Sequence, residues 1–194
     1  APSPHRVQHP CTVFGTCGAC TWLHFAYPAQ LEWKERIVLD TLKRLGGVVP
    51  IESSATEIPE LRLGYRTRAE FQGDGWKRGF YTEGSHDVVD VTACPLCHPT
   101  LNTALARLRE ANVSGPVEIT VNPDGDDVLV WTAKQIRRLT QAFPDAQSFE
   151  SDEDRHQFLY DGVPIVNGAF SQSSLPLNRL LRSTVHDALH GAAS

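Results

Sequence analysis

The sequence predicts an α+β fold in which an antiparallel β meander and hairpins combine with amphipathic helices. First, the segment 28–45 carries leucine and valine residues at helical spacing. Second, three short runs of alternating or β-branched residues lie between 65 and 93. Third, Asp-Gly pairs at 124–125 and 161–162 lie between apolar runs, which is typical of hairpin turns.

The first helix is expected over 28–45 because Pro28 suits a first helical position and Gly46-Gly47 supplies a stop. Its apolar positions are Leu31, Val38, Leu42 and Leu45. The preceding 27 residues have neither helical nor alternating periodicity and are rich in Pro, Gly and Cys. Something other than a hydrophobic core must therefore order them.

The remaining elements follow in chain order. Strands are expected within 65–72, 76–83 and 86–93, with turns at 73–75 and 83–85 between them. A helix at 99–112 places Leu101, Leu105 and Leu108 on one face. A hairpin over 117–133, a short helix within 134–143, a hairpin over 157–168 and a helix over 175–190 complete the chain, and the acidic run 148–156 is expected to be a solvated loop.

Composition bounds the function. The 194 residues are 41% hydrophobic and carry a formal charge of -5, so the chain is not a uniformly basic nucleic-acid binder, although a local basic face remains possible. No apolar run is long enough for a membrane helix and no segment resembles a signal peptide, so we expect a cytoplasmic protein without a membrane partner. The chain contains no methionine, and we expect it to be a portion of a longer protein.

The five cysteines fall in two patches, which indicates a metal site. Cys11, Cys17 and Cys20 form the first patch, and Cys94 and Cys97 the second. Their odd number and the lack of a secretory signal disfavour disulfides.

Two metal sites are compatible with this spacing. A zinc ribbon would use Cys17, Cys20, Cys94 and Cys97, although its two pairs are usually closer in sequence. An iron–sulfur cluster would use Cys11, Cys17, Cys20 and the remote Cys94, with Gly15 and Gly18 letting the backbone approach the sulfides. The spacing favours the cluster, and Cys97 is then a small buried residue.

Several segments in order resemble the RNA (uracil-C5) methyltransferases that carry a [4Fe-4S] cluster. The segment 11–20 is similar to that family's cluster loop, and Tyr27, Gln30, Leu31 and Lys34 to the helix after it. Tyr65-Arg66-Thr67-Arg68 resembles a Tyr-Arg-x-Arg strand, and 86–95 the segment that delivers the fourth ligand. The resemblance identifies the ligands as Cys11, Cys17, Cys20 and Cys94, in an N-terminal cysteine loop closed by the cluster.

The resemblance also implies a function and its boundaries. Residues 1–27 and 63–167 would form a cluster-bearing, RNA-binding central domain, whereas 28–62 and 168–194 would pack with a methyltransferase domain that is mostly absent. Phe170 and Gln172 are similar to a Phe-x-Gln motif whose residues approach the uracil and S-adenosylmethionine. The chain would be the RNA-binding portion of an S-adenosylmethionine-dependent enzyme and inactive alone, because the cofactor loop and the nucleophilic cysteine are missing.

Basic residues near aromatic ones suggest where RNA could bind. Arg62, Arg66, Arg68, Lys77 and Arg78 crowd one strand pair with Tyr65, Trp76 and Phe80 interleaved, and a second basic group follows at Lys134, Arg137 and Arg138. The expected partner is ribosomal or transfer RNA, and not DNA. Two alternatives are a non-catalytic, cluster-bearing RNA-binding or ribosome-associated protein and a zinc-ribbon interaction module.

Overall fold

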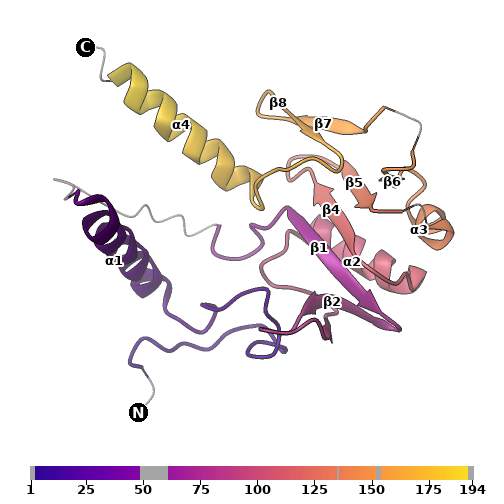
Figure 1. The fold of residues 1–194 in the computed structure, drawn as a ribbon, viewed down its shortest axis with the longest axis horizontal. Coiled ribbons are helices and arrows are strands. Elements are labelled where there is room, and N and C mark those ends of the chain that lie inside the picture. Colours follow the sequence, from indigo (N-terminus) through magenta and orange to yellow (C-terminus); the bar gives the residue numbers. More distant parts are fainter. Residues whose placement is uncertain (1–2, 49–60, 135, 152–153, 192–194) are drawn as a thin grey trace.

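The structure is a computed structural model that describes residues 3–48, 61–134, 136–151 and 154–191. A mixed sheet of strand order β3-β2-β1-β4-β5-β6 forms its centre (Figure 1). The strands are β1 (Arg68–Asp74), β2 (Lys77–Tyr81), β3 (Val88–Asp90), β4 (Val117–Val121), β5 (Val128–Thr132) and β6 (Gln147–Ser148). Each pair of neighbours is antiparallel except β5 with β6. The predicted meander and the first hairpin are confirmed.

The hydrophobic core lies between the sheet and α2 (Pro99–Ala111). Leu101, Leu105 and Leu108 on this helix are 0% exposed, as the helical spacing predicted. They belong to one buried cluster with Phe71 of β1 and Ile119 of β4. The short helix α3 (Arg137–Ala142) packs beside α2. A separate two-stranded hairpin, β7 (Gln157–Tyr160) and β8 (Val163–Val166), also agrees with the sequence.

The first and last helices, α1 (Tyr27–Gly46) and α4 (Leu175–Gly191), extend away from the sheet (Figure 1). Gly47 ends α1 with a left-handed backbone, at φ 62°, as the glycine pair predicted. The apolar faces of both helices are nevertheless largely exposed, because Ala29 and Leu175 are their buried residues. Side chains such as Val38 and Leu45 on α1 and Leu181 on α4 therefore remain in contact with solvent.

Among the described residues, the acidic run 148–156 is a largely exposed loop after its first residue, as the sequence predicted. Ser148 is 3% exposed and ends β6 beside Gln147. The Gln147 amide donates to the carbonyl of Asp154 and its oxygen accepts from the His156 backbone, so polar contacts order a segment that has few apolar residues. Residues 152–153 of the run lie outside the described residues. No helix in the described part of the chain has the length and apolar character that crossing a membrane requires.

Candidate metal centre and its surroundings

Four of the five cysteines line one small cavity of about 10 Å³. Three of them come from the N-terminal loop, and the fourth comes from the turn between β3 and α2. Apolar side chains, among them Phe80, Val91 and Leu96, complete the wall. The four cysteines are Cys11, Cys17, Cys20 and Cys94. The fifth, Cys97, is 2% exposed and does not line this cavity.

These thiols do not form a compact site for a single ion. Among the described residues, no three His, Cys, Asp or Glu side chains come close enough together to hold one metal ion. Cysteines in a tetrahedral zinc site bind at about 2.3 Å, which places their sulfur atoms roughly 4 Å from one another. The sulfurs of a multi-iron cluster lie further apart, because each thiolate binds a different iron.

The cysteine loop is attached to the turn that follows β2. The Gly18 amide donates to the carbonyl of Tyr81 at 2.8 Å. A Cβ at Gly18 would lie 3.0 Å from that oxygen and 3.1 Å from the backbone nitrogen of Glu83. The close approach that Gly18 permits is therefore to this turn, which corrects the expectation that it makes room for sulfides. Gly15 adopts a left-handed backbone at φ 89°.

Asn102 on α2 holds the turn that presents Cys94. Its amide oxygen accepts from the Cys94 backbone, and its amide nitrogen donates to the carbonyls of Cys94 and Cys97. His98 is the N-cap residue of α2, and its Nδ1 accepts from the Thr100 amide at 3.3 Å. The sequence reading missed Asn102. The available signal was a polar residue directly beside Leu101 on the buried face of a predicted helix.

The surroundings shift the pKa of four cysteines in different directions: Cys17, Cys20, Cys94 and Cys97. Burial raises the pKa of Cys17 and raises that of Cys20 to about 11. A hydrogen bond from the Cys97 thiol lowers the pKa of Cys94, and the same contact raises the pKa of Cys97. Metals bind the thiolate form, which the surroundings of Cys94 favour and the burial of Cys17 and Cys20 disfavours.

Arg66 joins three segments around the cavity. Its guanidinium donates to the Ala19 carbonyl in the cysteine loop at 3.1 Å and lies 5.7 Å from the ring centre of Phe80 on β2. Its backbone amide donates to the carbonyl of Leu96, beside Cys97. This arginine therefore connects the cysteine loop to the Cys94 turn, while its Nε is buried without a hydrogen-bond partner in the structure.

Arg68 and Phe170 come together from segments that are far apart in the sequence. The Arg68 guanidinium pairs with Glu118, donates to the Ser171 carbonyl at 3.0 Å and lies 5.5 Å from the Phe170 ring centre. Phe170 is 80% exposed, and Gln172 nearby is exposed as well. The structure therefore brings together two predicted RNA-contacting residues and leaves the aromatic ring accessible.

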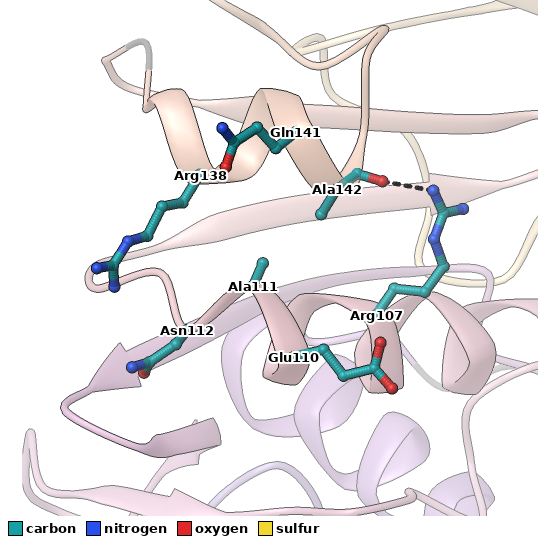
Figure 2. Close-up of a pocket in the computed structure, with 7 residues that line it drawn as sticks. All are labelled: Arg107, Glu110, Ala111, Asn112, Arg138, Gln141 and Ala142. Carbon is teal, nitrogen blue, oxygen red and sulfur yellow. Dashed lines mark hydrogen bonds between the residues drawn. The ribbon is translucent and has the colours of Figure 1, made fainter.

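Arg138, a member of the second basic group, lines an open hollow of about 470 Å³ between α2 and α3. Arg107 and Arg138 lie at opposite ends of it, and Glu110 contributes a carboxylate to the wall (Figure 2). Arg107 donates to the Ala142 carbonyl and stacks 4.4 Å from the Phe143 ring centre. Arg107 therefore helps to join α2 to α3.

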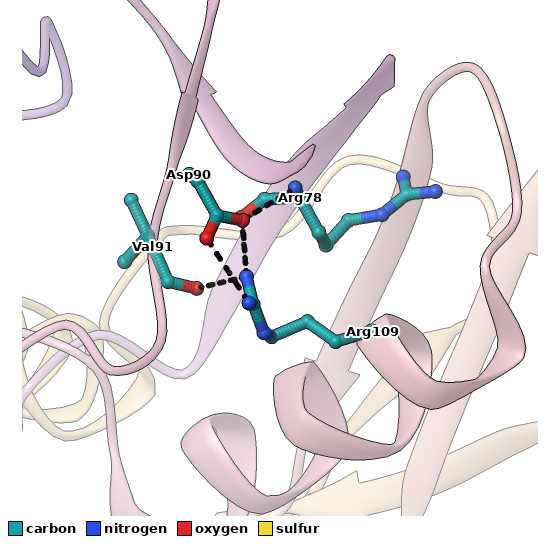
Figure 3. A network of polar contacts seen from close by, with 4 residues as sticks. All are labelled: Arg78, Asp90, Val91 and Arg109. Atoms are coloured by element: carbon teal, nitrogen blue, oxygen red, sulfur yellow. Dashed lines mark hydrogen bonds and ion pairs between the residues drawn. The ribbon is translucent and has the colours of Figure 1, made fainter. Parts of the chain in front are cut away.

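Arg78 is buried, which corrects the expectation that it contacts RNA. Its side chain is 2% exposed and donates to the carbonyls of Gly115 and Phe71, and burial lowers its pKa to about 10. Its backbone amide donates to Asp90, which forms an ion pair with Arg109 (Figure 3). Lys77, the neighbouring candidate, is partly exposed.

No profile of a known protein family matches the chain. It is 36% identical over 114 residues to an uncharacterized RNA methyltransferase of Nostoc sp., an alignment that covers 56% of this chain and 25% of that protein. Uncharacterized RNA methyltransferases of Nitratidesulfovibrio vulgaris and Aquifex aeolicus are 40% and 38% identical over 111 residues, which are 54% and 56% of this chain and 24% and 25% of theirs. The chain therefore spans about a quarter of the length of these relatives.

A solved structure shares the fold. The tRNA (uracil-54, C5)-methyltransferase of Pyrococcus abyssi, in complex with S-adenosyl-L-homocysteine, superposes with a TM-score of 0.62. The match has 21% sequence identity and covers 95% of this chain and 52% of that one. The resemblance to RNA methyltransferases is confirmed by sequence similarity to proteins of that name over about half the chain. The fold of nearly the whole chain is shared with the solved structure.

Proposed function

We propose that this relative of the RNA methyltransferases is the [4Fe-4S]-bearing, RNA-binding portion of an S-adenosylmethionine-dependent RNA uracil-5-methyltransferase, and that it does not catalyse methyl transfer by itself. The convergence of Cys11, Cys17, Cys20 and Cys94 on one cavity carries the proposal. Three of these residues lie within ten positions of one another, whereas Cys94 is remote in sequence. Such a convergence is expected of a structural metal centre.

The number and type of the donors support a cluster. Four cysteines, three from the N-terminal loop and one from the β3–α2 turn, line a cavity whose remaining walls are apolar. A cluster would bind one thiolate at each iron and would join the N-terminal loop to the β3–α2 turn. Its proposed contribution is this cross-link, which offsets the entropy cost of ordering a loop that has little apolar pattern.

The RNA-binding part of the proposal rests on the accessible members of the predicted set. Phe170 is available for stacking on a base, and the Arg68 guanidinium lies against the same ring. Lys77 offers a cation at the end of β2. Gln172 is exposed two residues beyond Phe170, where it is proposed to approach the cofactor of the intact enzyme.

Methyl transfer to uracil C5 requires a thiolate that adds at C6. Four of the five cysteines are the proposed ligands. The fifth, Cys97, is 2% exposed, and its thiol is hydrogen-bonded to that of Cys94. The chain therefore has no accessible nucleophile of this kind in the part that the structure describes. The exposed apolar faces of α1 and α4 support the proposal that 28–62 and 168–194 pack with a methyltransferase domain.

The experiment combines metal analysis with two assays on anaerobically purified protein. We expect a brown protein with about four irons and four sulfides per chain, which binds single-stranded RNA and transfers no labelled methyl group from S-adenosylmethionine to RNA. A colourless protein with bound zinc would favour the zinc-ribbon module instead. Methyl transfer by the chain alone would contradict its proposed inactivity, and absence of RNA binding would contradict its proposed partner.

A further inference from the structure

A groove of about 970 Å³ lies beside the candidate metal centre, on the other side of the cysteine loop. Its walls come from this loop, from α1, from residues 61–66 and from Leu177 of α4. Cys20 and Leu96 line both this groove and the cysteine cavity. The groove is therefore built partly by the same segments that the metal would hold in place.

The charge of the groove is one-sided. Among the residues that the structure describes, three cationic side chains and no Asp or Glu line the groove, although the whole chain has a net charge of -5. The cations are Lys34, Arg62 and Arg66. The hollow between α2 and α3 differs in this respect, because Glu110 forms part of its wall. The electrostatic character of the groove suits an anionic occupant.

Aromatic rings make up much of the remaining wall. Trp22, Phe25, Tyr27 and Tyr65 line the groove, and the Arg62 guanidinium lies 4.9 Å from the ring centre of Tyr27. Gln30 positions this part of α1 by donating to the carbonyls of Trp22 and Phe25 at 3.1 and 2.7 Å. Flat rings beside guanidinium groups are the surfaces on which unpaired nucleobases stack.

We propose that this groove binds a single-stranded segment of RNA, with bases against the aromatic wall and phosphates near Lys34 and Arg62. The inference rests on the proposed function and places the RNA at the Arg62, Tyr65 and Arg66 end of the predicted basic and aromatic set, where α1 and the cysteine loop complete the groove. Arg68 and Arg78 of that set do not line the groove, because Arg68 pairs with Glu118 and Arg78 is buried, whereas Lys34 and Arg62 line it and are exposed. Because the cysteine loop forms one wall, RNA affinity depends on the metal centre.

The test compares two double variants with equal changes in charge. Lys34→Ala with Arg62→Ala removes two exposed cations of the groove, and Lys43→Ala with Arg44→Ala removes two exposed cations in the last turn of α1, outside the groove. Binding of a fluorescein-labelled, single-stranded RNA of about twelve nucleotides is followed by anisotropy at several salt concentrations. We expect the groove variant to bind at least about tenfold more weakly, with a salt slope reduced by about 2, and the control to change less than about twofold.

The outcomes separate the groove from the proposed function. Equal weakening in both double variants, or no weakening in the groove variant, would overturn the groove assignment while RNA binding by the wild-type chain still stands. A wild-type chain that does not bind RNA would refute the proposed function itself.

A cross-linking measurement keeps the assignment testable if the groove variant does not fold. Wild-type protein is irradiated with RNA containing 4-thiouridine, and the cross-linked peptides are identified by mass spectrometry. We expect cross-links within 20–34 and 61–66, which supply most of the groove wall. Cross-links confined to other segments would place the RNA elsewhere and leave the groove to a protein partner, which would overturn the proposal.

Discussion

The Asn102 side chain forms hydrogen bonds with both backbone polar groups of Cys94: its Oδ1 accepts from the Cys94 amide at 2.8 Å and its Nδ2 donates to the Cys94 carbonyl at 3.0 Å. A third bond, from Nδ2 to the carbonyl of Cys97 at 3.2 Å, closes the turn. One helical side chain thus fixes the remote cysteine relative to α2 and to the core beneath it. The position of the candidate fourth ligand depends on this amide.

Replacing Asn102 by Ala should loosen the turn without unfolding the protein. Three hydrogen bonds are lost at about 1 kcal/mol each, so we expect a destabilisation of about 2–3 kcal/mol and faster loss of iron on exposure to a chelator. The matched control is Thr103→Ala, the next and exposed residue of α2, which should leave iron release unchanged. Equal rates of iron release in Asn102→Ala and wild type would show that the turn keeps its shape without the amide.

Gly73 should be intolerant of a side chain. A Cβ at this position would overlap the guanidinium of Arg78, which cannot move away because it is 2% exposed and bonded to the Gly115 and Phe71 carbonyls. We expect Gly73→Ala to lower the free energy of unfolding by about 3 kcal/mol in urea titrations. Gly46→Ala, at a helical position with room for a Cβ, should be neutral or stabilising. A neutral Gly73→Ala would refute the packing of Arg78.

Asp90 should contribute to the loss of folding stability at low pH. Hydrogen bonds from Arg109 lower the pKa of this carboxyl, so its contribution is present above the unfolded-state value of about 3.9 and is lost as the pH falls through the folded-state value. We expect Asp90→Asn to destabilise the fold by about 1–2 kcal/mol at pH 7 and much less near pH 3. Thermal melts across this range provide the measurement.

The exposed Asp126, in the turn between β4 and β5, offers the matched control for Asp90. Asp126→Asn should leave the pH dependence of the melting temperature unchanged. A destabilisation by Asp90→Asn that is the same at pH 3 and pH 7 would mean that the charge of Asp90 is not what stabilises the fold.

The sequence was sufficient for most of the elements, because their ends carry local signals. Pro28 and Gly47 bound α1, Pro99 begins α2, and the Asp-Gly pairs mark two hairpin turns. Burial was harder to predict. The apolar spacing of α1 predicted a helix correctly, but it does not reveal that Val38 and Leu45 are 54% and 82% exposed.

The candidate site shows the same limit. The spacing of the cysteines predicted a shared site, whereas the roles of Arg78 and Asn102 depend on tertiary contacts that no local pattern carries. Arg78 is accommodated because Gly73, on the neighbouring strand, leaves room for its guanidinium. Asn102 acts on a turn eight residues before it, which lies against the first turn of α2.

The most direct test of the central claim is the iron and sulfide content, with the absorption spectrum, of Cys94→Ser and Cys97→Ser beside the wild type after anaerobic purification. Cys94 lines the shared cavity and Cys97 does not. The account predicts that Cys94→Ser loses the cluster whereas Cys97→Ser keeps about four irons per chain. Loss of the metal from Cys97→Ser with retention in Cys94→Ser, or zinc in place of iron in the wild type, would contradict it.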